Sequence, residues 1–582
     1  MIDKKNASFV PSLCMGEIEE ELLVPYPAPK PAEAETLRAI FGTLEKMLGP
    51  RAADFAAWDR AGEMPPAFLQ ELREAGLFGL VVPEAYGGLG LGATAYARVI
   101  QELARYDASV AVTVGAHSSI GLRGLLLFGT PEQRARWLPR LATGELLAAF
   151  CLTEPTAGSD AASIKTTAVR DGDDFVLNGE KIWITNGGIA DLFTVFAKTS
   201  QEGRGHITAF VVTRDMKGVS SGPHEDKMGI RASSTTSVLL EDVRVPADHV
   251  LGEVGKGFKV AMRILNAGRT GLGGGSVGGM KRIIELAAHQ ARERSQFGRP
   301  IGSFGLVKEK LGRMVVDAYA AESVVNMVAG LVDRGHEEVA VESAISKVFA
   351  SEALFRTADE ALQIAGGMGY MREAPWERIV RDVRINRIFE GTSEILRLFI
   401  ALTAMNDVAQ ELKDISAGLK GIFDDPIKGF GLLSDYAKRR ASLATGLRRA
   451  KGTWTLLHPS LAEEQQAFEA ATTALARAAD RTLRRHGKRI IEEQLATRRL
   501  ADALVDLFAL GCVLARVSTA IDDRGADAAA PEREILRAFA AGARRRIDAS
   551  LAGLDDGEDA AVLAVGERVL EAGRYPWDNV ER

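Results

Sequence analysis

The sequence contains few cysteines. It has three among 582 residues, Cys14, Cys151 and Cys512, which are far apart and odd in number. The spacing excludes a disulfide framework, and a reducing compartment is the default expectation. Neither the cysteines nor the eight histidines, none of which forms a His-x-x-x-His pair, have the spacing of zinc ligands. We therefore expect no metal site.

An excess of positive charge is also lacking. The chain has 72 Lys and Arg against 78 Asp and Glu, a formal net charge of −6, whereas a general nucleic-acid binder has a basic domain. We expect no nucleic-acid partner. Hydrophobic residues at 46% and charged residues at 26% are ordinary for a soluble globular protein and exclude a disordered chain.

Long apolar runs are scarce as well. The first residues lack the apolar core of a signal peptide and the arginine-rich pattern of a transit peptide. No targeting peptide is evident, so we expect a cytoplasmic protein, with the inner face of the cell membrane as a peripheral site. The most apolar late stretch, 500–517, contains Asp502 and Asp506 about one turn apart. It is typical of a helix with a buried face and not of a membrane span.

The residue pattern changes several times along the chain. Four prolines between 25 and 31 indicate an extended lead-in, and helical periodicity follows. After about residue 148 come short apolar runs separated by Asp171-Gly172, Asn178-Gly179 and Asn186-Gly187, the dipeptides typical of β-hairpins. We expect five parts: an extended segment (1–32), a helical domain (33–148), a β domain (149–256), a helical bundle (257–403) and a C-terminal helical domain (404–582).

The stretch Gly273-Gly274-Gly275-Ser276-Val277-Gly278 has the G-x-G-x-x-G spacing of a dinucleotide-binding turn. That motif needs a strand before it, and residues 258–267 have helical periodicity instead. We therefore expect one helix that continues through these small residues and packs closely against a neighbour.

Two other segments could carry chemistry. The turn-rich stretch 150–160 offers hydroxyl and backbone N–H groups that can hydrogen-bond a heterocycle, although an ordinary polar hairpin loop would look the same. Glu390 lies between a charged helix (375–387) and an apolar helix that Thr392 or Ser393 can cap. A carboxylate held against apolar neighbours has a raised pKa and makes a general base. A solvated glutamate beside a helix start is the alternative.

Six short motifs stand in order along the chain. They are YGGLG (86–90), TEPTAGSD (153–160), KIWITNGG (181–188), RSQFGRPI (294–301), QIAGGMGY (363–370) and RIFEGTSEI (387–395). With these motifs the chain, from about Ser8 to its C-terminus, resembles the acyl-CoA dehydrogenase family, and its long C-terminal block is similar to the very-long-chain subgroup. The resemblance implies a mainly α fold with a central β domain: a helical bundle, a β-barrel, a second bundle and an additional C-terminal helical domain.

The resemblance also implies FAD, bound without covalent attachment between the β domain and the following bundle. Gly366 and Gly367 lack a Cβ atom, so their backbone could approach the dinucleotide closely. Arg294, Gln296 and Phe297, and the segment from Gln363 to Gly367, would reach FAD across a subunit boundary. The implied FAD contacts are Phe150, Leu152, Thr153, Ser159, Trp183, Ile184, Thr185, Arg294, Gln296, Phe297, Gln363, Ile364, Ala365, Gly366, Gly367, Thr392 and Glu394. Many relatives have glutamine where this chain has Gly305, so the resemblance implies no FAD contact at that position.

The same resemblance assigns the chemistry. Glu390 matches the base that removes a proton from the carbon α to the thioester, while a hydride leaves the β carbon for the flavin. The backbone N–H of Glu390 and a flavin hydroxyl would bind the thioester oxygen. Some relatives carry the base at the position of Gly268, which cannot act as one. The implied substrate contacts are Ser159, Asn266, Arg269, Phe389 and Gly391.

The C-terminal block carries no catalytic signature, but residues 416–455 combine apolar residues such as Phe430 and Leu433 with a basic cluster. Such a stretch can lie on an anionic membrane, whereas a solvated basic face on a packing domain is the alternative. The basic cluster consists of Lys438, Arg439, Arg440, Arg448, Arg449 and Lys451.

The expected function is FAD-dependent dehydrogenation of a long-chain acyl-CoA to trans-2-enoyl-CoA, with electrons passed to electron-transfer flavoprotein. Gly121, Gly124 and Gly268 are expected to leave room for a long acyl tail, and a homodimer is implied by the resemblance. Two rivals remain: an acyl-CoA oxidase that uses O₂, and an assembly or interaction protein with a vestigial flavin site.

Overall fold

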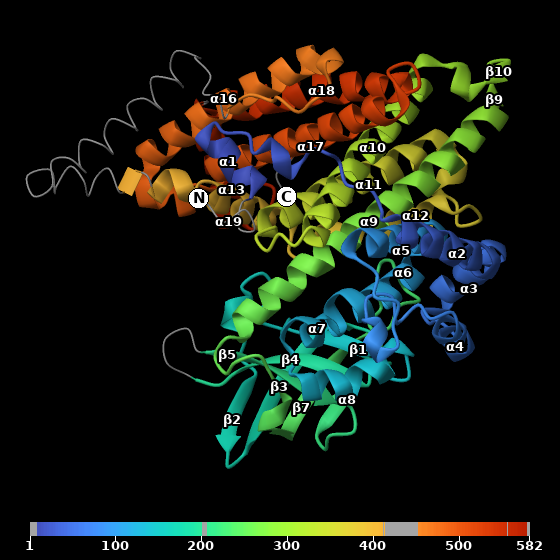
Figure 1. The fold of residues 1–582 in the computed structure, drawn as a ribbon, viewed down its shortest axis with the longest axis vertical. Coiled ribbons are helices and arrows are strands. Elements are labelled where there is room, and N and C mark those ends of the chain that lie inside the picture. Colours follow the sequence, from blue (N-terminus) through green and yellow to red (C-terminus); the bar gives the residue numbers. More distant parts are fainter. Residues whose placement is uncertain (1–7, 201–205, 411, 414–451, 556, 579–582) are drawn as a thin grey trace, which may run out of the picture. The chain divides into compact units, whose positions relative to one another are not determined.

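The computed structural model describes residues 8–200, 206–410, 412–413, 452–555 and 557–578 (Figure 1). They form two compact units, one of residues 25–396 and one that combines residues 8–24 with residues from 397 onward. The first unit contains helices and a β domain, and the second contains the additional C-terminal helices. The expected fold class, mainly α with a central β domain, is confirmed.

The first described residues do not form the extended lead-in that the prolines suggested. Residues of α1 (Phe9–Met15) are helical. Phe9 and Leu13 lie one turn apart and are fully buried, and the Phe9 ring lies 6.3 Å from the Trp454 ring and 6.0 Å from the Phe508 ring. The prolines come only after this helix, so its apolar face can pack in the second unit.

Helices of the first unit's N-terminal part surround an apolar core. α5 (Ala93–Tyr106) ends at Asp107, whose carboxylate accepts hydrogen bonds from two backbone N–H groups and so caps α6 (Ala108–Gly115). α6 continues into a π-helical segment (Ala116–Gly121), a wider turn that is frequent at functional sites. The other helices here are α2 (Pro31–Leu48), α3 (Ala52–Ala61), α4 (Pro66–Glu74), α7 (Arg123–Phe128) and α8 (Pro131–Ala142).

The β domain is one eight-stranded sheet with the order β6-β7-β3-β2-β4-β5-β8, and β1 pairs with β4 in parallel. Side chains of β4 alternate between two apolar clusters: Phe193 and Val195 join one, and Leu192 and Phe196 join the other. The strands are β1 (Ala148–Cys151), β2 (Thr167–Asp171), β3 (Asp174–Thr185), β4 (Leu192–Lys198), β5 (Ile207–Thr213), β6 (Val219–Ser221), β7 (Thr235–Pro246) and β8 (Val250–Leu251).

The three dipeptides of the β domain have different structures. Asp171-Gly172 is the turn of the β2–β3 hairpin, as expected. Asn178-Gly179 is not a turn, because β3 continues through it with a shift of register against β7. The Asn178 side chain hydrogen-bonds both the backbone and the side chain of Asp242 across this bulge, which satisfies its polar groups within a strand. Asn186-Gly187 ends β3, but the next strand, β4, is not a neighbour of β3.

α9 (Gly257–Glu293) confirms that the glycine-rich stretch is helix and not a dinucleotide-binding turn. A Cβ atom on Gly274 would lie 2.6 Å from the carbonyl oxygen of Ala97 on α5, and one on Gly278 only 1.8 Å from that of Gln101. These glycines therefore allow α5 and α9 to pack backbone against backbone. The remaining elements of the first unit are β9 (Ser295–Gln296), β10 (Arg299–Pro300), α10 (Gly305–Asp333), α11 (Ala340–Ala365) and α12 (Trp376–Arg384), before α13 (Ser393–Ala404).

The described C-terminal part of the second unit consists of α16 (Ala462–His486), α17 (Gln494–Arg524), α18 (Ala530–Ala552) and α19 (Glu558–Ala572). On α17, Asp502 pairs with Arg397 and Asp506 with Arg546, each at 2.6 Å.

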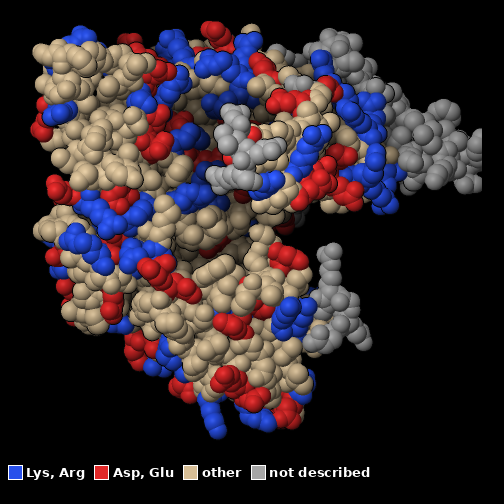
Figure 2. Space-filling view, turned by 180° about the vertical axis from the view of Figure 1, so that it is seen from behind, with Lys and Arg blue, Asp and Glu red and all other residues tan. Residues whose placement is uncertain are grey.

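By length and composition alone, three helical stretches of the described chain could cross a membrane. Ala108–Phe128, Gly305–Asp333 and Gln494–Arg524 bury 56, 67 and 83% of their most apolar windows inside the structure. Lys and Arg are interspersed with Asp and Glu over the face drawn in Figure 2.

Candidate functional site

A cavity of about 290 Å³ lies inside the first unit, between α5, α6, α9 and α12. It runs along α9 from Gly268 to Leu286, which is 18 residues or about 27 Å of helix. The π-helical segment after α6 lines one end together with Phe389 and Glu390. Its length and its largely apolar wall suit a long flexible ligand.

Glycines form the α9 side of this cavity. Gly268, Gly271, Gly275 and Gly279 are spaced by three or four residues, so they lie on one face of the helix. A Cβ atom on Gly275 would meet Ile100 at 3.6 Å, an ordinary contact, so larger side chains there would extend into the cavity. The glycines leave that space open.

Two of the three glycines expected to line the acyl site do not line it. A Cβ atom on Gly121 would lie 2.7 Å from the Ala148 backbone, and one on Gly124 would lie 2.6 Å from the Leu251 side chain. Both positions serve close packing of helices on the β domain. Only Gly268 of the three lines the cavity.

Glu390 lies at the near end of the cavity, in the short connection between α12 and α13. Its φ is 59°, and Gly391 after it has a φ of 97°. A left-handed conformation is uncommon for a residue with a side chain and is often found where function requires it. Oε2 of Glu390 is buried without a hydrogen-bond partner and lies 2.9 Å from where a Cβ on Gly268 would be.

Two buried cations hold the backbone at Glu390. Arg269 Nε donates to the Glu390 carbonyl at 3.3 Å, and Arg269 Nη1 donates to the side-chain oxygen of Asn266 at 2.8 Å. Lys347, which is fully buried on α11, donates to the Gly391 carbonyl at 2.7 Å. These bonds fix two consecutive left-handed residues, so the carboxylate is held in place without being hydrogen-bonded itself.

Burial sets the proton affinity of this site. It raises the pKa of Glu390 to about 7, although the charges of Arg269 and Lys347 oppose the rise. Burial also lowers the pKa of Lys347 to about 8, against the attraction of Glu390. A carboxylate with a pKa near neutrality, and with an oxygen free to accept a proton, is a competent general base.

The β domain contributes a second group of predicted residues. Thr185 lines the cavity, while Trp183 on the same strand exposes 63% of its surface at a φ of 55°. The neighbouring loop is tied to this strand because Ile182 N–H donates to the carbonyl of Thr153 at 3.0 Å. The structure thus brings the loop of 153–160 and the strand end of 183–185 together, although Ser159 is exposed and does not line the cavity.

A buried ion pair holds that loop. Lys181 Nζ donates to Glu154 at 2.6 Å and to the carbonyl of Leu152 at 3.2 Å. Both charged side chains are almost completely buried, at 0 and 3% exposure. Glu154 also accepts hydrogen bonds from the backbone N–H groups of Lys165 and Thr166.

The other predicted contacts are not among the residues that line the cavity. Arg294, Gln296 and Phe297 form an exposed hairpin, in which Phe297 is 93% exposed with a φ of 54°. Thr392 caps α13 by accepting a hydrogen bond from Ile395 N–H at 3.3 Å, as its sequence position suggested. The assignment of the exposed hairpin to a neighbouring subunit stays a prediction. Phe150, Leu152, Ile184, Gln363, Ile364, Ala365, Gly366, Gly367 and Glu394 likewise do not line the cavity.

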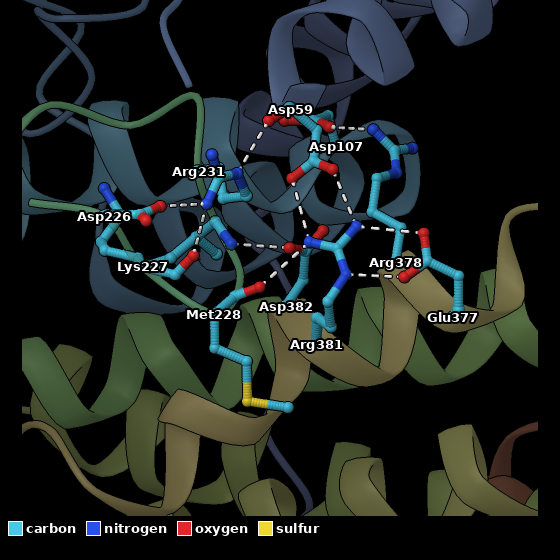
Figure 3. A network of polar contacts seen from close by, with 11 residues as sticks. Asp59, Asp107, Asp226, Lys227, Met228, Arg231, Glu377, Arg378, Arg381 and Asp382 are labelled. Atoms are coloured by element: carbon cyan, nitrogen blue, oxygen red, sulfur yellow. Dashed lines mark hydrogen bonds and ion pairs between the residues drawn. The ribbon is translucent and has the colours of Figure 1, made fainter. Parts of the chain in front are cut away.

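An ion-pair network ties α12 to the β domain (Figure 3). Arg381 pairs with Asp59 of α3 at 2.8 Å and donates to the carbonyl of Met228 at 3.0 Å. The next residue, Asp382, accepts from the backbone N–H of Ile230 at 2.6 Å, and Ile230 lines the cavity. The network fixes the cavity wall and the helix that leads to Glu390.

Sequence reasoning missed Lys347, the Arg381–Asp382 network and the glycines at 271, 275 and 279. The sequence did contain a signal for Lys347, because it lies within the apolar helix 341–364. A lysine is rarely fully buried unless it is paired, so its position in such a helix indicates a specific partner. The partner, a backbone carbonyl 44 residues later, could not be identified from periodicity.

Four family models match the chain. They are the acyl-CoA dehydrogenase N-terminal domain (residues 33–145), middle domain (149–243) and C-terminal domain (255–405), and the ACAD9/ACADV C-terminal domain (459–575). A curated relative is the mitochondrial very long-chain specific acyl-CoA dehydrogenase of Macaca fascicularis, which is 43% identical over 94% of this chain and 84% of its own length.

Two solved structures are also similar. An acyl-CoA dehydrogenase of Bacillus anthracis complexed with FAD is 34% identical, has a TM-score of 0.81 and matches 98% of this chain and 97% of its own. A chain in a structure of the electron transferring flavoprotein of Acidaminococcus fermentans is 35% identical, has a TM-score of 0.62 and matches 64% of this chain and 98% of its own.

Proposed function

The chain belongs to the acyl-CoA dehydrogenase family, and we propose that it is an FAD-dependent enzyme that oxidises long-chain acyl-CoA to trans-2-enoyl-CoA. One observation carries the proposal: the unpaired carboxylate of Glu390, with a pKa of about 7, lies at one end of a long apolar cavity. Removal of a proton from the carbon α to a thioester requires such a base.

Glu390 accepts the α proton on Oε2, the oxygen that the protein leaves without a partner. Its left-handed backbone, held by Arg269 and Lys347, keeps the carboxylate at the cavity end while the acyl chain lies along α9. The surrounding apolar wall excludes water and keeps the base weakly solvated.

The residues present fit FAD. Trp183 offers an exposed aromatic face near Thr185, whose side chain lines the cavity that Glu390 also lines. Bound FAD supplies the hydride acceptor for the β carbon. The loop from Thr153 to Ser159 and the strand end from Trp183 to Thr185 would hold FAD. The Lys181–Glu154 pair keeps these two segments next to each other.

A long acyl chain is the proposed substrate, because the glycine-lined cavity follows α9 for about 27 Å. Each buried CH₂ group contributes about 0.8 kcal/mol to binding. A purified protein that is yellow, and whose absorbance is bleached by palmitoyl-CoA without oxygen, supports this function. A colourless protein, or a yellow one that palmitoyl-CoA leaves unchanged, would favour the assembly protein with a vestigial site.

Electron-transfer flavoprotein is the proposed electron acceptor, and the similarity to a chain in an electron transferring flavoprotein structure supports a flavoprotein partner. The rival is an oxidase that reduces O₂ directly. Stopped-flow mixing of the reduced enzyme with oxygen separates them, since a dehydrogenase should reoxidise far more slowly with O₂ than with the flavoprotein.

A homodimer and a peripheral contact with an anionic membrane through residues 416–455 complete the proposal. Most of that stretch, 416–451, lies outside the described residues, so its support is the charge pattern of the sequence. The corresponding proposed location is the cytoplasm, with the enzyme bound peripherally to the inner face of the cell membrane.

A further inference from the structure

The cavity reaches the surface at the end opposite Glu390. There it is lined by Ala52, Arg282 and Pro375, which are all exposed. An acyl chain that enters at Glu390 therefore meets a second mouth and not a closed wall.

The second mouth differs chemically from the middle of the cavity. Ile100, Val112 and Leu272 are among the apolar residues that line the middle. The far end instead has three arginines in its lining, Arg105, Arg282 and Arg378, and these come from α5, α9 and α12. We refer to this group as the arginine mouth.

The arginines of the arginine mouth have more N–H donors than their present ion pairs use. Arg105 and Arg282 share one carboxylate, Glu285, at 2.8 and 3.4 Å, and Glu285 does not itself line the cavity. Arg105 also lies 3.6 Å from Glu102. An arginine has five N–H donors, and exposed ion pairs are weak enough to be exchanged for another carboxylate.

Arg378 is more firmly paired. It donates to Asp107 at 3.2 Å, as Figure 3 shows. Asp107 and, one turn further along α12, Asp382 are the aspartates of the described cavity lining near Arg378, so this part of the lining combines three arginines with two aspartates.

We propose that the arginine mouth binds the carboxylate at the far end of an ω-carboxylated long-chain acyl thioester. The inference rests on the proposed function and adds a substrate class to it. From Gly268 to Arg282 is 14 residues, or about 21 Å of α9. An extended chain advances about 1.25 Å per C–C bond of ~1.5 Å, so roughly 17 carbons bridge that distance.

The geometry makes the selectivity depend on length. A chain of 16 carbons brings its ω-carboxylate to the arginine mouth, where charge-assisted hydrogen bonds form. A chain of eight carbons leaves the carboxylate in the apolar middle, where an unpaired charge is strongly unfavourable. A methyl-terminated chain has no such penalty at either length.

The test compares kcat/KM for four substrates: octanoyl-CoA, octanedioyl-CoA, palmitoyl-CoA and hexadecanedioyl-CoA. The ratio of diacid to monoacid should be at least about tenfold higher at 16 carbons than at eight, the size of one lost charged hydrogen bond. Arg282→Gln should lower the rate with hexadecanedioyl-CoA about tenfold and the rate with palmitoyl-CoA less than twofold. Arg292→Gln, on the same helix but outside the cavity, should change neither.

Equal diacid-to-monoacid ratios at both lengths, or equal losses for both 16-carbon substrates in Arg282→Gln, would overturn the proposal. Calorimetric binding of hexadecanedioyl-CoA does not depend on turnover. Arginine-dependent binding without flavin reduction would therefore contradict the proposed function while supporting this site. Binding that Arg282→Gln leaves unchanged would contradict the site alone.

Discussion

The buried ammonium of Lys347 donates a hydrogen bond of 2.7 Å to the carbonyl of Gly391, one residue after Glu390. It thus acts on Glu390 in two ways, by holding its left-handed backbone and by placing a positive charge near its carboxylate. Lys347 does not need to touch the substrate to affect the reaction. We regard it as a positioning residue.

Lys347→Met should therefore lower kcat and change its pH dependence. Glu390 acts as a base only when deprotonated, so the rate should rise with pH through its pKa of about 7. Loss of the nearby cation raises that pKa, which should move the rising limb to higher pH by about one pH unit or more. The measurement is the pH profile of flavin reduction, with Lys310→Met, which loses only its ion pair with Glu360, as control. A Lys347→Met profile that is scaled down but unmoved would indicate a purely structural role.

Glu390→Gln should retain FAD but lose nearly all turnover. The amide has the shape of the carboxylate and is not a base, and general base catalysis contributes about 10²–10⁴-fold to rate. Bound FAD is measured by absorbance, and flavin reduction by acyl-CoA is followed in a stopped-flow instrument. Reduction at nearly the wild-type rate would show that another residue is the base.

Apolar residues before Glu390 and a helix cap after it made Glu390 a candidate base but left a solvated glutamate as the alternative. The resemblance to the acyl-CoA dehydrogenase family assigned it as the base. Sequence reasoning also identified α9 as helix through its glycines, since periodicity reports the type of an element. It did not show which helix face meets which neighbour. For this reason Gly121 and Gly124 were expected in the acyl site, whereas they pack against Ala148 and Leu251.

Contacts between segments far apart in the chain could not be predicted from the sequence either. The bond from Lys347 to Gly391 and the pair of Arg381 with Asp59 join residues 44 and 322 positions apart. No repeat or motif links them. The helix α1 was not predicted for a different reason. The four prolines that follow it led us to expect an extended chain over all of the first 32 residues.

The buried pair of Lys181 and Glu154 gives a prediction about stability. Lys181→Met leaves Glu154 charged and buried without its cation, which should destabilise the protein by about 3–5 kcal/mol and weaken FAD retention. Urea unfolding and flavin content measure the two effects. Arg140→Met, which removes an exposed pair with Glu145, should change stability by less than about 1 kcal/mol. The double change Lys181→Met with Glu154→Leu should recover stability, and its failure to do so would argue against an unpaired charge as the cause.

Residues 416–455 should bind anionic liposomes through their basic cluster. Near such a surface each Lys or Arg contributes about 1 kcal/mol, so reversing Arg439, Arg440, Arg448 and Arg449 to Glu should release the protein at low salt while soluble activity stays intact. The matched control reverses three exposed arginines of α18, which should leave binding unchanged. These are Arg537, Arg544 and Arg545. Cosedimentation that is the same for all variants would identify the stretch as a solvated basic face, and light scattering separately checks the dimer.

The glycine face of α9 should set the longest acyl chain that the enzyme accepts. A Cβ atom on Gly275 makes only an ordinary contact with Ile100, so Gly275→Leu should fold, with its side chain filling the middle of the cavity. Butanoyl-CoA, which lies near Glu390, should react nearly as before. Palmitoyl-CoA must pass residue 275 and should lose most of the binding energy of its distal CH₂ groups, about 0.8 kcal/mol for each.

The expected result is therefore a reversal of chain-length preference, measured as kcat/KM for butanoyl-, octanoyl- and palmitoyl-CoA. Gly312→Leu is the matched control, because Gly312 lies on α10 outside the cavity and a Cβ atom there would contact nothing within 4 Å. Both substitutions place leucine in a helix and remove one glycine, so their effects on helix propensity are alike. A Gly275→Leu enzyme that still prefers palmitoyl-CoA would mean that the acyl chain does not follow α9.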